Sequence, residues 1–379
     1  MQEVVIAGYQ RSPFTFAEKG ALAKVRPDDM AAAVVRRLLE STGVKGDEVD
    51  DVILGCAFPE AEQGLNVGRL VGFLAQLPNT VPGATVNRFC GSSMQAIHMA
   101  AGAIRMNAGE VFVCGGVESM TRVPMPGFNP LPNPGLYASF PQAYMGMGET
   151  AENLARSYQI PRAAQEEFAL SSHAKAAAAH QAGRLKDEIV PIDDRGSAIE
   201  ADGCIRFDTN REALAALPPA FDRDGTVTAG TSAPLTDGAA AVLVCSEAYT
   251  RRRNLAPLAR IKSIAVIGCA PEIMGIGPVL ASRRALERAG LQIGDIDVIE
   301  LNEAFAAQVL ACARDLRIDL DRLNSDGGAL ALGHPLGASG ARITGKAAAL
   351  LKRTGGRYAL ATMCIGGGQG IATVLEAVQ

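Results

Sequence analysis

Two short stretches of the chain recur at one fixed spacing, and they decide the fold. Asp-Val-Ile-Leu at residues 51–54 has a counterpart in Asp-Val-Ile-Glu at 297–300, 246 positions later. Gly-Ser-Ser-Met at 91–94 opens an expected helix, and Gly-Ala-Ser-Gly at 337–340, also 246 positions later, opens another. One offset that serves two separate landmarks indicates that an α/β unit is duplicated within the chain.

The sequence after each of these helices supports the same interpretation. Each expected helix ends near a glycine and is followed by an apolar run typical of a buried strand, at 111–116 and at 358–364. Strands that alternate with Ala-rich helices favour largely parallel sheets covered by helices. We therefore expect an α/β fold with two similar halves.

The segment between the halves has a different character. Residues 119–235 contain a cluster of Pro, Gly and Asn, then an amphipathic helix expected at 162–183, then polar turns. A loop region this long inside a compact chain is usually functional. We expect an N-terminal half at 1–118 that is completed by 236–258, an inserted loop and substrate-binding domain at 119–235, and a C-terminal half at 259–379.

Composition excludes several classes of protein. The chain has 379 residues, with 36 Lys plus Arg against 40 Asp plus Glu, so its net charge is −4. Hydrophobic residues make up 48% and charged residues 20%, which argues against disorder. A near-neutral charge argues against a generally basic nucleic-acid-binding protein. The length suggests two or three domain-sized units with an ample core.

Neither targeting signals nor metal motifs are evident. The first residues read as a strand, and no run reaches about 18 apolar residues, so we expect no transmembrane segment and a cytoplasmic location. None of the eight cysteines forms a Cys-x-x-Cys motif, and the four histidines have no ligand-like spacing with them. A metal site is therefore not expected.

Cys90 is the first candidate for chemistry. It lies in Asn-Arg-Phe-Cys-Gly-Ser-Ser-Met at 87–94, between an expected strand and a helix expected at about 92–107. Free N–H groups and the helix dipole at a helix N-terminus favour a thiolate over a thiol. A cysteine at a helix start can also simply pack, but this setting predicts a nucleophile.

His334 occupies the corresponding place in the second half. It lies in Gly-His-Pro-Leu-Gly at 333–337, a turn that would present its side chain to a cavity, although a surface turn is equally compatible. Because the two halves are related by duplication, we expect His334 to meet Cys90 where the halves join. A thiol and an imidazole together are suited to covalent acyl transfer.

Two further segments end expected strands. Cys364 is followed by Ile365 and three glycines, beginning with Gly366, whose backbone N–H groups could approach a reacting atom. Asn302 follows the strand expected at 298–301 and could orient a water molecule or a carbonyl group, or could cap a helix. The glycines do not fit a dinucleotide-binding motif, because no strand–GxGxxG–helix with a downstream acid surrounds them.

These four segments together resemble the active-site elements of the thiolases. The matching stretches are NRFCGSSMQA at 87–96, NEAFAAQ at 302–308, GGALALGHPLGASGARI at 327–343 and TMCIGGGQG at 362–370. The resemblance covers essentially the whole chain and is closest to the 3-ketoacyl-CoA thiolases (acetyl-CoA C-acyltransferases) of fatty-acid β-oxidation. It implies the thiolase fold, with two duplicated α/β halves in a layered α-β-α-β-α core and an inserted loop domain.

The resemblance also implies a role for each residue. Cys90 would attack the 3-keto carbonyl of a 3-ketoacyl-CoA, and His334 would take its proton. His334 and a water held by Asn302 would then bind the thioester oxygen. Cys364 would protonate the departing acetyl-CoA carbanion and later deprotonate incoming CoA. The N–H groups of Cys90 and Gly366 would form the oxyanion hole. Coenzyme A is a substrate and product, and no permanently bound cofactor is implied.

Binding of the CoA moiety is implied for three further residues: Arg206, Ser232 and Met147. Arg206 matches a family arginine that contacts the CoA nucleotide. Ala233 departs from the family, because many relatives have a serine there that contacts pantetheine, so that hydrogen bond is either missing or supplied by Ser232. Relatives specific for acetoacetyl-CoA have a bulky histidine at the position of Gly146, so Gly146 favours medium or long acyl chains.

Two further groups of side chains are expected near the acyl tunnel and the CoA site. Phe140, Tyr144 and Met145, which lie near Gly146, are candidates to line the tunnel. Five cations of the inserted region are candidates for a positive rim around CoA: Arg184, Lys186, Arg206, Arg211 and Arg223.

Alternative functions remain open at the level of sequence. A ketoacyl synthase of the same superfold would use one cysteine, so the second cysteine, Cys364, argues against it. A non-catalytic CoA-binding subunit has no reason to keep Cys90, His334 and Cys364 together. An acetoacetyl-CoA-specific biosynthetic thiolase is the nearest enzymatic alternative. The resemblance implies a homodimer or homotetramer, with a hydratase/dehydrogenase partner subunit as a further possibility.

Overall fold

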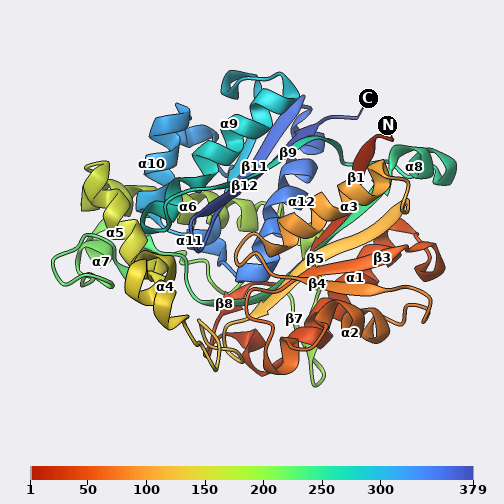
Figure 1. Ribbon diagram of the computed structural model, residues 1–379, viewed down its shortest axis with the longest axis horizontal. Helices are drawn as coiled ribbons and strands as arrows, with labels where there is room; N and C mark the ends of the chain where they lie inside the picture. The colour runs from red at the N-terminus through yellow and green to blue at the C-terminus, as the bar shows by residue number, and fades with distance from the viewer. Residues whose placement is uncertain (1, 379) are drawn as a thin grey trace.

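A ten-stranded mixed sheet system forms the centre of the molecule. The computed structural model describes residues 2–378 (Figure 1). The strands lie in the order β10-β11-β12-β9-β1-β8-β5-β3-β4, and β2 pairs with β8. Their bounds are β1 Val4–Arg11, β2 Thr15–Phe16, β3 Asp51–Gly55, β4 Gly83–Val86, β5 Val111–Ser119, β8 Thr236–Ser246, β9 Ala259–Gly268, β10 Val298–Leu301, β11 Tyr358–Ile365 and β12 Gln369–Glu376.

The two halves of this sheet system repeat one topology. In the first half, β1 is antiparallel to β8, β8 is antiparallel to β5, and β5 is parallel to β3. The second half repeats these orientations: β9 is antiparallel to β12, β12 is antiparallel to β11, and β11 is parallel to β10. Only two residue pairs, Val5–Arg260 and Ile6–Ala259, join the halves between β1 and β9. The predicted duplication is therefore confirmed by the strand order.

One strand has only a reduced counterpart. β4 extends the first half by pairing in parallel with β3 over four residues. The equivalent edge of the second half has a single parallel bridge, between Ile299 of β10 and Leu323. The duplication is thus close but incomplete at its outer edges.

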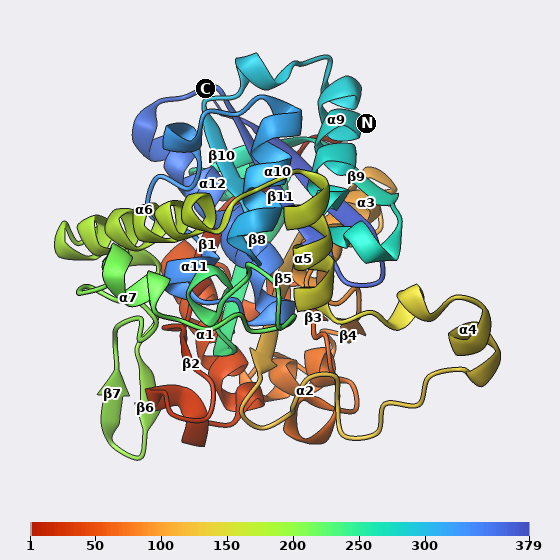
Figure 2. The same ribbon diagram turned by 90° about the vertical axis from the view of Figure 1, so that its left-hand side faces the viewer.

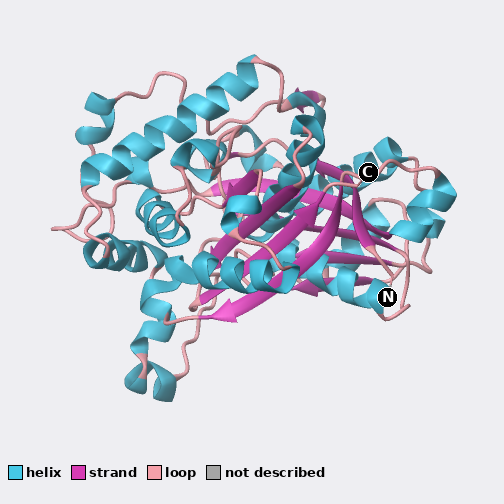
Figure 3. Ribbon diagram, turned by 90° about the horizontal axis from the view of Figure 1, so that it is seen from above, coloured by secondary structure: helices cyan, strands magenta, loops and turns pink. Residues whose placement is uncertain are grey.

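Helices divide the molecule into five layers. α3 (Ser92–Arg105) and α12 (Leu336–Thr354) lie between the two halves of the sheet system and pack against strands of both. α1 (Pro27–Thr42) and α2 (Val67–Leu74) cover the outer face of the first half, whereas α9 (Gly277–Ala289) covers that of the second. Figures 1 and 3 show the strands enclosed by helices in this way. The α-β-α-β-α arrangement expected for the thiolase fold is confirmed.

The two central helices approach each other very closely. The hydroxyl oxygen of Ser93, in the first turn of α3, accepts a hydrogen bond from the N–H of Ala341 in α12 at 2.8 Å. A Cβ atom on Gly340 would lie only 2.4 Å from the backbone nitrogen of Met94, so glycine is required at this crossing. This contact fixes the N-terminal ends of both helices, where the predicted site residues lie.

The region between the halves packs beside one end of this core. It contains α4 (Pro134–Ser139), α5 (Met147–Ser157), α6 (Arg162–Gln181), α7 (Arg211–Ala215) and the hairpin of β6 (Ile192–Asp194) and β7 (Ser197–Ile199). Figure 2 shows α4 at the end of a long excursion that stands away from the body. The remaining helices are α8 (Glu247–Arg253), α10 (Ala306–Leu316) and α11 (Ala329–Leu332). The domain boundaries given above stay a prediction.

Buried ion pairs attach this region to both halves. Arg11 of β1 pairs with Asp202 at 2.7 Å and with Glu188 at 2.8 Å. Glu188 also accepts a hydrogen bond from Lys346 of α12 at 2.8 Å. Because all of these side chains are buried, each charge depends on its partners. Over residues 2–378, none of the helices is long and apolar enough to cross a membrane.

Candidate active site

Cys90 lies in a tight connection between β4 and α3. The residue before it, Phe89, has φ of 43°, a left-handed conformation that costs of order 1–3 kcal/mol for a residue with a side chain. Ser92 holds this connection, because its hydroxyl accepts from Arg88 N–H at 2.8 Å and donates to the Phe89 carbonyl at 2.6 Å. The strained turn places the Cys90 sulfur at the N-terminal end of α3.

The protonation of Cys90 differs from the sequence-based expectation. Burial raises the pKa of its thiol to about 12, although the N–H groups of Gly366 and of Cys90 itself oppose this rise. The prediction that the helix N-terminus would favour a thiolate is therefore wrong for the resting site. Sequence alone shows the helix start, whereas the loss of water around the sulfur comes from tertiary packing.

His334 is held from three directions. Its backbone N–H donates to Thr236 Oγ1 at 3.0 Å, and its Nδ1 lies 2.6 Å from Ser339 Oγ. Its Nε2 lies 3.4 Å from Asn302 Nδ2. Burial lowers the pKa of His334 to about 3, and Arg342 adds a charge repulsion in the same direction. The imidazole is therefore neutral at physiological pH.

Asn302 follows β10 and is completely buried. Its backbone N–H donates to the Thr362 carbonyl at 3.0 Å, which anchors it to β11. It does not cap a helix, since Phe305 is the N-cap residue of α10. Within residues 2–378, its Oδ1 has no hydrogen-bond partner. A buried amide with an open acceptor beside an imidazole suits the binding of water or of a polar substrate group.

Cys364 lies near the end of β11, and the glycine turn after it faces Cys90. Gly367 and Gly368 have φ of 77° and 81°, so the chain can reverse tightly into β12. This turn aims the backbone N–H of Gly366 at the Cys90 sulfur. Burial raises the pKa of Cys364 well above its ordinary value, so the thiol is protonated and can act as an acid.

One cavity brings these groups together. It has a volume of about 450 Å³, and Cys90, His334 and Cys364 all line it. Gly146, Met147 and Ser232 also line it, and the acyl and pantetheine contacts expected for them stay a prediction. Asn302 is not among the lining residues, but its Nδ2 lies 3.4 Å from Nε2 of His334. The predicted site residues therefore converge from both halves and from the inserted region.

The lining also contains residues that the sequence analysis missed. They are mostly large apolar side chains: Met120, Met125, Phe221, Leu235, Met274, Phe305 and Leu336. The concentration of methionine and phenylalanine in loops was the sequence signal that could have indicated this apolar lining. Phe140, Tyr144 and Met145, which were predicted to line the acyl tunnel, are not among the residues that line this cavity. Phe140 and Tyr144 are each 41% exposed on the excursion near α4, and Met145 accepts a hydrogen bond from Asn153.

Arg206 lines a second, smaller cavity of about 190 Å³. Ser232 and Pro234 line both cavities, so the two adjoin. The Arg206 guanidinium lies 5.3 Å from the centre of the Phe16 ring, and the Ser232 hydroxyl donates to the Thr228 carbonyl at 2.8 Å. Ser232 can therefore still accept, but not freely donate, a hydrogen bond.

The proposed cationic rim is only partly free. Arg184 forms a salt bridge with Asp326, and Arg211 forms one with Glu167. These two cations are therefore engaged by carboxylates of the chain itself.

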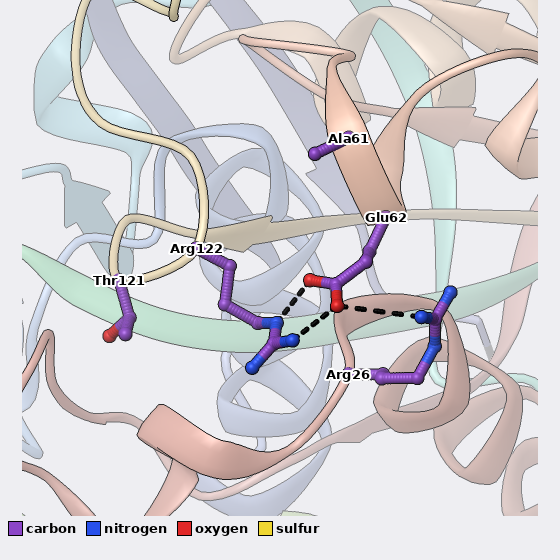
Figure 4. A pocket seen from close by; sticks show the side chains of 5 residues that line it. All are labelled: Arg26, Ala61, Glu62, Thr121 and Arg122. Atoms are coloured by element: carbon purple, nitrogen blue, oxygen red, sulfur yellow. Dashed lines mark hydrogen bonds and ion pairs between the residues drawn. The ribbon is translucent and has the colours of Figure 1, made fainter.

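Another cavity, of about 550 Å³, has a different character (Figure 4). Figure 4 shows the Glu62 carboxylate between the guanidinium groups of Arg26 and Arg122, with Thr121 nearby. Arg26 also pairs with Asp28 at 2.7 Å, and no cysteine or histidine is among the residues that line this cavity. In residues 2–378, no group of three or more His, Cys, Asp or Glu side chains is arranged to hold a metal ion.

Comparisons with known proteins match the chain along nearly its whole length. Residues 4–248 match the thiolase N-terminal domain, and residues 255–377 match the thiolase C-terminal domain. A 3-ketoacyl-CoA thiolase of Bacillus subtilis (strain 168) is 46% identical, over 99% of this chain and 100% of the relative. Those of Enterobacter sp. (strain 638) and Citrobacter koseri are each 48% identical over the full length of both chains.

Proposed function

This chain belongs to the thiolase family, and from that premise we propose that it is a 3-ketoacyl-CoA thiolase, an acetyl-CoA C-acyltransferase. It cleaves a 3-ketoacyl-CoA with coenzyme A to give acetyl-CoA and an acyl-CoA shortened by two carbons. The observation that carries this proposal is the convergence of Cys90, His334 and Cys364 on one cavity. Degradation of fatty acids by β-oxidation is the role that this reaction serves.

The first half of the reaction forms an acyl-enzyme. The Cys90 sulfur attacks the 3-keto carbon while His334 takes the thiol proton. Because the pKa of Cys90 is raised to about 12 and that of His334 is lowered to about 3, the proton moves as the new bond forms. The Cys90 and Gly366 N–H groups stabilise the oxyanion, and one such donor is typically worth about 3–4 kcal/mol.

Collapse of this adduct breaks the bond between C2 and C3. The electron pair becomes the enolate of acetyl-CoA, whose oxygen receives hydrogen bonds from His334 and from a water held by Asn302. Cys364 donates its proton to C2, and its raised pKa keeps that proton in place beforehand. In the second half, Cys364 accepts the thiol proton of incoming CoA, and the CoA sulfur attacks the acyl group on Cys90. The bond between Cys90 and the acyl group breaks, and the Cys90 sulfur takes back the proton held by His334. The two transfers give ping-pong kinetics.

Coenzyme A enters as a substrate, and the proposal includes no permanently bound cofactor. Met147 and Ser232 contact the pantetheine portion, and Arg206 contacts the nucleotide portion, through the two adjoining cavities. The proposal also includes a homodimer or homotetramer, a hydratase/dehydrogenase partner subunit and a cytoplasmic location. Family resemblance alone supports these three points.

A preference for medium or long acyl chains is part of the same proposal. A Cβ atom on Gly146 would have its nearest neighbour, Glu149 Oε2, at 3.5 Å, so the space beside this glycine is open. Met120 and Met125, which are flexible and apolar, line the same cavity and suit a hydrocarbon chain.

The test is CoA-dependent cleavage of 3-ketoacyl-CoA esters of increasing chain length, with Cys90→Ala measured beside the wild type. We expect cleavage by the wild type, its loss in the variant, and higher kcat/KM for longer chains than for acetoacetyl-CoA. Preference for acetoacetyl-CoA would reject the chain-length proposal and leave the thiolase activity. Absence of cleavage with every ester would reject the function.

A further inference from the structure

A serine behind His334 contacts the ring nitrogen that faces away from Asn302. Nδ1 of His334 lies 2.6 Å from Ser339 Oγ. Both residues are buried, with 5% and 1% of their surfaces exposed. Ser339 lies in the first turn of α12, whose N-cap residue is Pro335. Its hydroxyl donates to the Pro335 carbonyl at 3.1 Å.

The protons of this contact can be assigned by counting donors. A serine hydroxyl has one proton to donate and two lone pairs that accept. The Ser339 hydroxyl donates to the Pro335 carbonyl at 3.1 Å, and that oxygen also accepts from the Ala338 N–H at 2.9 Å. The 2.6 Å contact with Nδ1 then requires a proton on Nδ1, because two lone pairs would repel at this distance. A neutral imidazole carries one ring proton, so Nε2 keeps its lone pair.

The other side of the ring gives the same assignment independently. Asn302 Nδ2, a donor group, lies 3.4 Å from Nε2 and needs an acceptor there. Burial lowers the pKa of His334 to about 3, so the ring does not carry a second proton that would change the count. The nearby charged side chain, Arg342, forms its own buried pair with Glu300 at 2.9 Å.

We propose that Ser339 is a positioning residue that holds His334 in the Nδ1–H tautomer, so that Nε2 faces Cys90 as the proton acceptor. This inference rests on the proposed function, in which His334 takes the Cys90 proton. Ser339 touches no reacting atom and acts only through the imidazole.

The same hydrogen bond serves both charge states of the ring. When the Cys90 sulfur forms its bond to the 3-keto carbon, the thiol proton moves to Nε2 and the carbonyl electron pair moves to oxygen. The imidazolium then carries protons on both nitrogens. Nδ1–H still donates to Ser339, and the new Nε2–H can donate to the thioester oxygen. The Ser339 hydroxyl keeps donating to the Pro335 carbonyl throughout, so nothing rearranges on the Nδ1 side of the ring during proton transfer.

Kinetic measurements on matched variants test the role of the hydroxyl. We expect Ser339→Ala to lower kcat by about 10- to 100-fold with KM for CoA unchanged within twofold, because the ring loses its tautomer and orientation. Ser339→Thr keeps the hydroxyl and should remain within about threefold of the wild type. Ser282→Ala is the control, because Ser282 is a fully buried helical serine of α9 whose hydroxyl has no partner in residues 2–378.

A structural role for Ser339 would give a different pattern. If the side chain only filled space, Ser339→Thr would be impaired more than Ser339→Ala, and that result would overturn the proposal. Unchanged kcat in Ser339→Ala would also overturn it.

Nuclear magnetic resonance of the ring nitrogens tests the tautomer without substrate. The chain has only four histidines, so ¹⁵N-histidine labelling gives few signals, and His334→Gln identifies those of His334. We expect a protonated Nδ1 and an unprotonated Nε2 in the wild type at neutral pH, and population of the other tautomer in Ser339→Ala. A protonated Nε2 in the wild type would reject the proposal. Because this measurement needs no turnover, it decides the tautomer even if the proposed function fails.

Discussion

The Glu118 carboxylate accepts a hydrogen bond from the backbone N–H of Gly337 at 2.8 Å, across 219 residues of sequence. Glu118 lies near the end of β5 in the first half, and Gly337 lies in the first turn of α12, three residues after His334. The same carboxylate accepts from the Ala57 N–H at 2.8 Å and from Gln63 Nε2 at 2.7 Å. One buried acid thus ties the His334 loop to the half that carries Cys90.

Removal of this acid should destabilise the protein and disturb the site. Glu118→Ala leaves several buried donors unpaired, and each unpaired donor costs about 1–3 kcal/mol. We expect the free energy of unfolding, measured in urea, to fall by about 3 kcal/mol or more. The control is Glu110→Gln, which breaks the partly exposed pair with Arg252 and should change it by less than about 1 kcal/mol. Equal effects of the two substitutions would contradict the role assigned to Glu118.

A histidine at position 146 should narrow the acyl specificity. Gly146 has φ of −64°, and a Cβ there meets only ordinary contacts, so Gly146→His should fold and project its ring into the cavity. We expect kcat/KM for long-chain 3-ketoacyl-CoA esters to fall at least tenfold relative to acetoacetyl-CoA. Gly345→Ala is the contrast, because its Cβ would lie 2.2 Å from the Tyr9 ring and neither residue lines the cavity. That variant should lose stability, not selectivity. An unchanged chain-length profile in Gly146→His would show that the acyl chain lies elsewhere.

The alkylation of Cys90 should report its raised pKa. With the pKa of the thiol at about 12, the thiolate fraction rises about tenfold per pH unit over the whole neutral range. The rate of iodoacetamide modification at Cys90, followed by peptide mass spectrometry, should therefore keep rising from pH 6 to pH 9. A plateau near pH 7 would indicate a preformed thiolate and would contradict the burial argument.

Buried His98 should make stability depend on pH. Burial lowers its pKa to about 3, and its Nε2 lies 2.8 Å from Thr373 Oγ1. The unfolded chain binds a proton at this residue below about pH 6.5, whereas the folded chain does not. Stability is therefore lost as the pH falls from about 6.5 toward 3, by about 1.4 kcal/mol per pH unit.

The comparison of His98→Gln with the wild type isolates this contribution. His173 and His334 also have lowered pKa values, and Glu300, with its pKa raised to about 7, acts in the opposite direction. These groups are present in both proteins, so their contributions cancel. Urea unfolding at pH 7, 6 and 5 should show a slope smaller by one proton in the variant. Parallel slopes would show that His98 is protonated in the folded protein.

Much of the fold could be predicted because it repeats. The 246-residue offset between 51–54 and 297–300 predicted the duplicated halves, and the expected strand at 298–301 has those bounds in the structure. The helix expected at 162–183 ends at Gln181, two residues early. The single bridge at Leu323 in place of a second β4 left no trace in the sequence, because edge pairing depends on where the neighbouring loops pack.

The candidate site was predictable in its members but not in its physical state. Sequence motifs placed Cys90, His334 and Cys364 at corresponding ends of strands and helices, and the cavity joins them. The raised pKa of Cys90 could not be foreseen, because it results from burial by distant segments. The direction of the excursion around Phe140 could not be predicted either, because the composition of a Pro- and Gly-rich loop does not determine which of its side chains turn inward.

Capture of the acyl-enzyme tests the central claim most directly. The wild type is mixed with a long-chain 3-ketoacyl-CoA in the absence of free CoA, and the products are analysed by mass spectrometry. The account predicts one equivalent of acetyl-CoA per active site and an acyl group, two carbons shorter than the substrate chain, on the peptide that contains Cys90. An acyl group on Cys364, or acetyl-CoA release without any acylated Cys90, would contradict it.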